Sequence, residues 1–215
     1  MFPLPDLVVF PGVVQALHVF EPRYRKMTED CLAADNLITM CLYRDAESEL
    51  SDEKGPPPIF EHVCVCKIFA HNELEDGRHN LMVAGVKRAV IKRELSVDQP
   101  YRMAEVDLIE DEVTLNDDEL SKLRGELLKK CEAAKMLSSL TQHMDIKKLL
   151  DQDIPLGLLV DLIAFVGQLD CRHRQELLEL ANVEIRCWKL IELIGSRQLD
   201  NAETPSRFPP DFSSN

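Results

Sequence analysis

The chain has 215 residues, 45% of them hydrophobic, which fits one large domain or two small ones with a sizeable core. Its formal net charge of -13 disfavours non-specific nucleic-acid binding, because an acidic surface repels phosphate groups. The 7 cysteines show no paired spacing, which favours reduced thiols in a cytoplasmic protein. No apolar run reaches the ~20 residues that a membrane-spanning helix needs, and Met1 leads directly into structured sequence, so we expect neither a membrane span nor a targeting segment.

Residues 2–32 are expected to form a turn, a strand and a helix in quick succession. Pro11-Gly12 is a turn signal, because proline presets φ and glycine adopts a positive φ without steric cost. Residues 15–20 are then predicted to be a strand, and Pro22 fits the first turn of a helix, where its missing N–H costs nothing. One face of this helix is expected to be apolar, with Tyr24, Met27, Cys31 and Leu32.

Short strands are expected to follow this opening. Residues 37–43, 59–70 and 101–109 are predicted strands, and the polar stretch 44–58 is predicted to be an exposed loop. Many short strands joined by turns indicate a largely antiparallel sheet that forms a small barrel.

The segment between these strands carries two backbone signals. Asp76-Gly77 favours a two-residue hairpin turn, which needs a positive φ at both central residues. Gly85 interrupts the next strand pattern, as a β-bulge or a close approach of another backbone segment would.

The periodicity becomes helical near residue 115. Asn116 followed by Glu119 is a capping-box pattern, and apolar residues then recur at three- and four-residue steps. Residues 138–153 are predicted to be a short or broken helix. The segment that begins at Pro155 is apolar nearly all round, which predicts the central helix of a bundle.

Two further helices are predicted from their capping residues. Asp170 and Asn182 can accept the first free N–H groups of a helix, and Gly195 is expected to end the last helix. The last helix carries five large apolar side chains that are expected to be buried against the other helices, namely Ile185, Trp188, Leu190, Ile191 and Ile194.

The predicted fold class is α+β, in three parts. Residues 1–113 form a β-barrel subdomain with one helix. Residues 114–200 form a helical bundle, because helices this short are marginal alone and must pack on one another. Residues 201–215, which are polar and contain three prolines, form a disordered tail.

Three blocks of the sequence carry a family resemblance, namely residues 2–32, 76–88 and 158–194. They resemble the N-terminal, substrate-recognising domain of the ATP-dependent protease Lon, and above all the stand-alone bacterial proteins made only of that domain. The resemblance implies that the β part is a PUA-like pseudo-barrel. It also implies a module that binds exposed apolar or unfolded polypeptide, with a protease as a further candidate partner. Residues 63–66 depart from the family pattern, because the Gly-Thr often found there is absent.

Motifs of the catalytic parts of Lon are missing from this sequence. It has no phosphate-binding G-x-x-x-x-G-K-[ST] motif. Ser51 and Lys54 match a Ser-x-x-Lys pair, but they lie in the expected loop, where nothing would exclude water from a nucleophile. We therefore predict a protein that is not an enzyme and needs no cofactor. An unrecognised catalytic site, a small-molecule pocket and the oligomeric state stay open.

Histidine and cysteine side chains invite a metal interpretation that the spacing does not favour. His62, Cys64 and Cys66 share one strand face, but no fourth ligand is evident, so buried thiols beside a rim histidine are the better interpretation. Cys171 and His173 stand two residues apart on a predicted helix and therefore point in different directions.

A groove between the β and helical parts is the expected binding site, because polypeptide ligands of low polarity need apolar walls. Its candidate wall is Phe10, Pro11, Phe20, Tyr24 and Gly85. The resemblance places Arg88 where the barrel meets the N-terminal segment, and we predict a structural ion pair between Arg88 and Glu21.

An RNA-binding protein is the alternative from another functional class, because PUA-like barrels often bind RNA. This function needs a basic stripe, and the densest basic cluster is Lys87, Arg88, Lys92 and Arg93. A single strand divides these four side chains between two faces, and the chain is acidic overall. Nucleic acid is therefore the less favoured partner.

Overall fold

A computed structural model describes residues 1–44, 56–134, 154–167, 169–197 and 213–214. Most of the expected loop 44–58, the Ser51–Lys54 pair, the expected helix 138–153 and residues 201–212 of the expected tail lie outside these described residues. The chain divides into two compact units, Met1–Ile109 with Pro210–Asn215, and Glu110–Pro209. The expected groove between the two parts of the chain stays a prediction.

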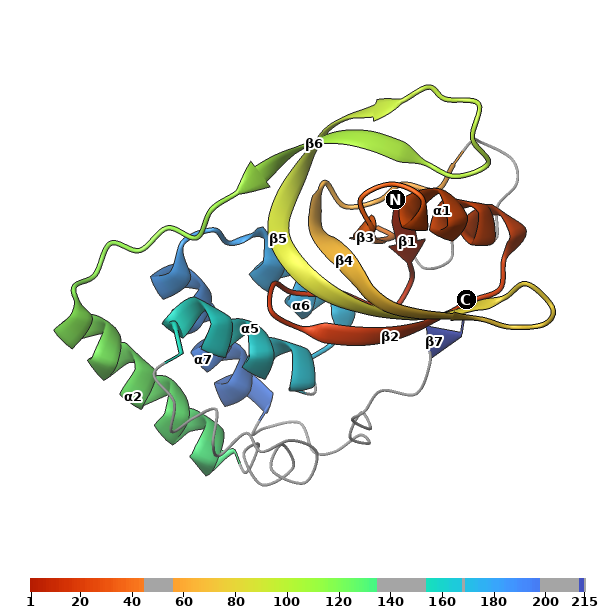
Figure 1. Cartoon of the computed structure of the whole chain (residues 1–215). Coiled ribbons are helices and arrows are strands. Elements are labelled where there is room, and N and C mark those ends of the chain that lie inside the picture. Colours follow the sequence, from red (N-terminus) through yellow and green to blue (C-terminus); the bar gives the residue numbers. More distant parts are fainter. Residues whose placement is uncertain (45–55, 135–153, 168, 198–212, 215) are drawn as a thin grey trace. The chain divides into compact units, whose positions relative to one another are not determined.

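The first unit is a mixed sheet of seven strands in the order β1-β3-β4-β5-β2-β7, with β6 also paired to β5. β1 is parallel to β3 and β7 is parallel to β2, whereas the other pairs are antiparallel. The strands are β1 (Phe2–Leu4), β2 (Val14–Val19), β3 (Leu37–Leu42), β4 (His62–Glu73), β5 (His79–Leu95), β6 (Met103–Ile109) and β7 (Ser213–Ser214). The first part of the long β5 pairs with β2 and its last part with β6, so this strand joins the two sides of the sheet (Figure 1).

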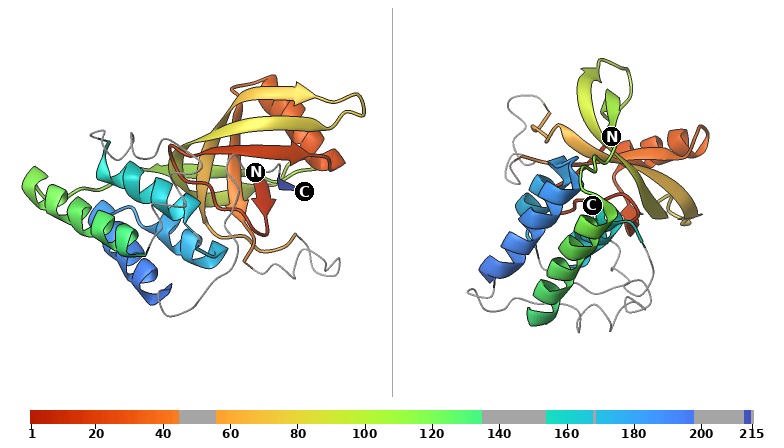
Figure 2. Two further views of the ribbon diagram at one scale, coloured as in Figure 1. Left: turned by 90° about the horizontal axis from the view of Figure 1, so that it is seen from below. Right: turned by 90° about the vertical axis from the view of Figure 1, so that its left-hand side faces the viewer.

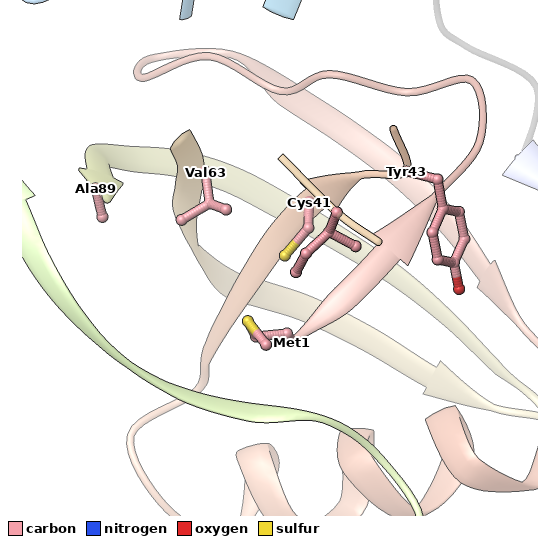
Figure 3. Close-up of a cluster of buried hydrophobic side chains, with 6 residues drawn as sticks. Met1, Cys41, Tyr43, Val63 and Ala89 are labelled. Atoms are coloured by element: carbon pink, nitrogen blue, oxygen red, sulfur yellow. The ribbon is translucent and has the colours of Figure 1, made fainter. Parts of the chain in front are cut away.

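The sheet curls around an apolar interior. Figure 3 shows the side chains of Met1, Cys41 and Val63 inside this curl, contributed by different segments of the strand-rich unit. The amino group of Met1 donates to the carbonyl oxygen of Arg102 at 2.6 Å, which ties the start of β1 to the segment that leads into β6. The sequence prediction of a β-rich part with one helix, in an α+β fold, is therefore confirmed.

Helix α1 (Pro22–Leu32) packs on this sheet through one face. Proline stands at its first turn as predicted, and Tyr24 and Met27 are buried. The Tyr24 ring lies 4.6 Å from the ring of Phe2, and burial raises the pKa of the Tyr24 hydroxyl. Cys31 and Leu32, which were expected on the same face, are only half-buried. The third buried residue of α1 is Thr28, whose hydroxyl donates to the Tyr24 carbonyl at 2.9 Å.

The hairpin between β4 and β5 is present, but its turn is longer than predicted. Five residues, 74–78, connect the strands, and of the Asp76-Gly77 pair only Gly77 has a positive φ. The amide of Gly77 donates to the Leu74 carbonyl, and the Asp76 carboxylate accepts from the Arg78 amide. The side chain of Asp76 thus stabilises the wider turn in place of a second residue with positive φ.

The second unit is helical, with α2 (Asp117–Ala133), α5 (Leu156–Val166), α6 (Cys171–Glu179) and α7 (Val183–Arg197) among its described residues. Helix α7 packs closely against each of the other three, and Figure 2 shows it alongside α2. Most of α5 is buried, as its composition indicated, and among the described helices α7 contacts each of the other three. The central place of the helix after Pro155 stays a prediction, because residues 135–153 lie outside the described residues.

All three predicted helix caps are confirmed. The Asn116 side chain accepts from the Glu119 amide at 3.0 Å while the Glu119 carboxylate accepts from the Asn116 amide, which completes a capping box. Asp170 accepts from the amide of His173, and Asn182 accepts from the amide of Ile185.

Two expectations about α7 are wrong. The helix does not end at Gly195 but continues to Arg197. A Cβ atom at Gly195 would lie 3.1 Å from the end of the Lys130 side chain on α2, so this glycine leaves room for that side chain. Ile185 and Trp188 were expected on the packed face, but they are 56% and 54% exposed. The buried face of α7 runs instead through Val183, Cys187, Leu190 and Ile194.

Glu184, at the start of α7, holds the segment that leads into α2. Its carboxylate accepts from the amides of Thr114 at 2.7 Å and Leu115 at 2.9 Å. Burial by itself raises the pKa of Glu184, but these amide donors outweigh that effect and leave the pKa below its usual value.

The pH dependence of unfolding should reveal this interaction. Because the folded state lowers the pKa of Glu184, its contribution to stability is complete above a pH of about 4.5 and is lost as the pH falls through the lower, folded value. Urea unfolding followed by the fluorescence of Trp188, the only tryptophan of the chain, should show stability falling as the pH is lowered below about 4.5. Glu184→Gln should be less stable at pH 7 and should have a flatter pH profile. An unchanged profile would contradict the assigned role.

Candidate functional site

The candidate functional site is the edge of β2 that faces away from β5, which we call the β2 edge (Val14–Val19). β7 pairs with it in parallel, with Ser213 opposite Leu17 and Ser214 opposite His18 (Figure 1). Among the described residues no other strand pairs with this edge. Unpaired backbone groups of an edge strand can bind an extended polypeptide, because they continue the hydrogen-bond ladder of the sheet.

Phe10, Pro11 and Gly85 lie together at the start of this strand. The amide of Gly12 donates to the Gly85 carbonyl and the amide of Gly85 donates to the Val13 carbonyl, both at 2.8 Å. A Cβ atom at Gly85 would overlap the carbonyl oxygen of Phe10. The close backbone approach predicted for Gly85 is therefore confirmed. A register shift in the β4–β5 pairing also lies here, because Val65 pairs with Lys87 and Cys66 pairs with Gly85.

The five predicted wall residues do not form one surface. Phe10 and Tyr24 are buried in the core and Gly85 is buried beside Phe10, whereas Pro11 is half-buried. Phe20, which directly follows β2, is 41% exposed. Contact of any of these residues with a polypeptide stays a prediction, and Phe20 is the member with the most exposed surface.

A polar network stands beside Phe20. The His18 ring lies 6.1 Å from the Phe20 ring, and its Nδ1 is 2.7 Å from the Asn80 amide oxygen. Arg78 reaches the other ring nitrogen of His18 at 3.3 Å and donates to the Asp76 carboxylate at 2.6 Å. The end of β2 thus offers an exposed aromatic ring next to hydrogen-bonded polar groups.

Arg88 and Glu21, the two residues of the predicted ion pair, each have another neighbour in the structure. Arg88 is 2% exposed, and its guanidinium carbon lies 5.9 Å from the centre of the Phe10 ring. Glu21 accepts from Arg23 at 2.9 Å, at the start of α1. The ion pair between Arg88 and Glu21 stays a prediction.

Three thiols of the first unit, those of Cys41, Cys64 and Cys66, are buried and poorly suited to chemistry. Cys64 and Cys66 are fully buried, as predicted, and His62 beside them is half-buried. Burial raises the pKa of Cys66 well above its usual value and that of Cys41 to about 12, so these thiols remain protonated and unreactive at neutral pH. Among the described residues no group of three or more histidine, cysteine or acidic side chains is arranged to hold a metal ion.

Two members of the basic cluster on β5, Lys92 and Arg93, pair with acidic side chains of β6. The Lys92 amino group lies 3.6 Å from the Glu105 carboxylate and 3.5 Å from that of Asp107, and Arg93 donates to Glu105 at 2.8 Å. These pairs reduce the positive field that an RNA backbone would need.

Sequence reasoning missed two features of the helical unit. One is the exposed Ile185 and Trp188, which stand three residues apart on α7 and so form neighbouring apolar groups on its surface. The other is the buried Arg186, whose guanidinium contacts Asp111 at 2.7 Å and Asp161 at 3.2 Å. No local pattern identifies Arg186, because its partners are distant in sequence. Among the described helices, none is both long and apolar enough to cross a membrane.

The fold is that of solved Lon N-terminal domains. A crystal structure of a Lon N-terminal domain protein from Xanthomonas campestris covers 89% of this chain and 95% of its own, with a TM-score of 0.61 and 24% identity. The N-terminal domain of a Mycobacterium avium complex Lon protease covers 90% of this chain and 96% of its own, with a TM-score of 0.67 and 20% identity.

The sequence comparisons define the family. Residues 1–196 match the family described as the ATP-dependent protease La (LON) substrate-binding domain, and the chain belongs to that family. Lon protease from Aquifex aeolicus is 29% identical over 202 residues, which are 90% of this chain. Lon protease from Dictyoglomus thermophilum is 26% identical over 207 residues, or 96% of this chain. The chain spans about a quarter of the length of these relatives, namely 24% and 25%.

Proposed function

We propose that this chain is a non-catalytic module that binds exposed apolar or unfolded polypeptide. The observation that carries the proposal is the match of residues 1–196 to the LON substrate-binding family. It is supported by the edge strand β2, which pairs on its outer side with two residues of β7 within the described part of the chain, and by an exposed aromatic ring beside it. The module would deliver a bound polypeptide to a protease and would not cut it. The proposal includes a cytoplasmic location, in keeping with seven free cysteines.

A direct binding experiment tests this function. Fluorescein-labelled β-casein, a disordered polypeptide, is titrated with the full chain, and fluorescence anisotropy gives the Kd. We expect saturable binding that changes little with salt, because apolar and backbone contacts are screened less than charge contacts. Binding of a structured RNA hairpin that weakens steeply with salt, without binding of β-casein, would replace the proposal with the RNA alternative.

Phe20→Ala should weaken β-casein binding by about three- to tenfold, because removal of an exposed aromatic anchor costs about 1 kcal/mol of binding free energy. Its unfolding midpoint in urea should stay close to that of the wild type, since the ring is 41% exposed. The matched control is Phe69→Ala on β4, which removes another exposed phenylalanine from the same unit, away from the β2 edge. Equal effects of the two substitutions would argue against a specific role for Phe20.

A further inference from the structure

We infer that the β2 edge binds a client polypeptide as an added strand, parallel to β2, and that residues 213–214 of the same chain occupy this position in its absence. The inference rests on the proposed function and names the mode of binding. β7 already pairs with Leu17 and His18 in the parallel direction. This edge therefore accepts an extended segment from outside the main sheet, and it does so next to the exposed Phe20.

The register indicates what a longer segment would contact. β2 has six residues, Val14–Val19, and β7 pairs with two of them. A parallel strand that continued beyond the position of Ser214 would pass Val19 and bring a residue alongside Phe20. The start of β2 is not open in this way, because Gln15 and Ala16 are buried and the Gln15 side chain donates to the Ala16 carbonyl at 2.7 Å. A client that takes the position of β7 and continues past Val19 can thus keep the pairing that β7 makes and also contact an aromatic ring.

The chemical preference of the site follows from these contacts. Backbone pairing does not depend on the client's sequence, which suits a receptor for many unfolded chains. Phe20 favours an apolar side chain at one position of the client, because burial of apolar surface stabilises the complex. A folded protein does not offer such a segment, so the site selects extended, unfolded polypeptide. β7 competes with that segment for the same edge.

Proline substitutions in β7 test the competition in the full chain. Ser213→Pro combined with Ser214→Pro removes the backbone N–H groups of β7, which weakens its pairing with β2. The matched control is Ser213→Ala with Ser214→Ala, which keeps both N–H groups. We expect the proline variant to bind labelled β-casein at least threefold more tightly than the wild type, and the alanine variant to bind with wild-type affinity.

Hydrogen exchange locates the bound client. In the free protein, backbone amides of Val14–Val19 should exchange faster in the proline variant than in the alanine variant, and β-casein should protect them again. Binding of β-casein without protection of this segment, or with equal affinity for all three forms, would overturn the added-strand inference but leave the proposed function intact. Absence of β-casein binding by all three forms would overturn both.

Discussion

Gly85→Ala should lower the free energy of unfolding by about 3 kcal/mol, because the new methyl group has no room. A Cβ atom at this position would overlap the carbonyl oxygen of Phe10 and lie 3.2 Å from the Cys64 sulfur. The backbone could relieve the overlap only by moving away from the Phe10–Val13 turn. That movement would break or lengthen the two hydrogen bonds that Gly85 makes with Gly12 and Val13, each 2.8 Å long.

The cause is space and not backbone conformation. The described glycines with a positive φ are Gly12 and Gly77, and Gly85 is not among them. Urea unfolding followed by far-UV circular dichroism measures the effect. The control is Gly125→Ala in α2, where nothing beyond the adjacent residues and the helix's own backbone lies within 4 Å of the new Cβ, and where alanine should stabilise the helix by about 0.5–1 kcal/mol. A Gly85→Ala variant as stable as the wild type would show that the turn adapts without cost.

Local signals in the sequence predicted the features that neighbouring residues determine. Pro22 begins α1, and Asn116 and Glu119 form their capping box. Gly85 allows the backbone at Phe10 to approach closely. In the first two cases the residue type restricts the backbone or supplies a hydrogen bond within a few positions, and at Gly85 the glycine itself, inside a strand pattern, was the signal of a close approach. The prediction therefore needed no knowledge of which elements pack together.

Features that depend on packing were predicted less well. Gly195 was interpreted as a helix end, whereas it leaves room for the Lys130 side chain of α2. Trp188 was assigned to the packed face of α7, because four- and three-residue spacings allow more than one apolar stripe on a helix with many large side chains. The same limit applies to the candidate site. Sequence alone selected Phe20, but it grouped this exposed ring with the buried Phe10 and Tyr24.

The buried cluster around Arg186 is the clearest case of a feature without a local signal. Arg186 on α7 is fully buried and contacts Asp161 on α5 at 3.2 Å and Asp111 at 2.7 Å. It also donates to the Leu180 carbonyl. Gly157 makes room for this arrangement, because a Cβ atom there would overlap the Asp111 carboxylate and lie 3.0 Å from the Arg186 guanidinium. The residues that form the cluster are up to 75 positions apart.

Arg186→Met should therefore lower the free energy of unfolding of the helical unit by about 3–5 kcal/mol. Methionine fills much of the same volume, but the buried carboxylate of Asp161 loses its guanidinium partner, and the Leu180 carbonyl loses a donor. Urea unfolding followed by Trp188 fluorescence measures the effect. The control is Arg93→Met on β5, which removes an ion pair whose arginine side chain is 69% exposed and should cost no more than about 1 kcal/mol.

A second substitution separates the loss of charge compensation from the loss of packing. If the buried carboxylate causes the instability, Arg186→Met combined with Asp161→Leu should recover part of the loss, because an apolar pair of similar volume can replace a buried ion pair. If the double variant is as unstable as the sum of the two single variants, the cost lies in the shape and backbone hydrogen bonds of Arg186. A loss below 1 kcal/mol for Arg186→Met alone would show that the ion cluster does not hold α5 and α7 together.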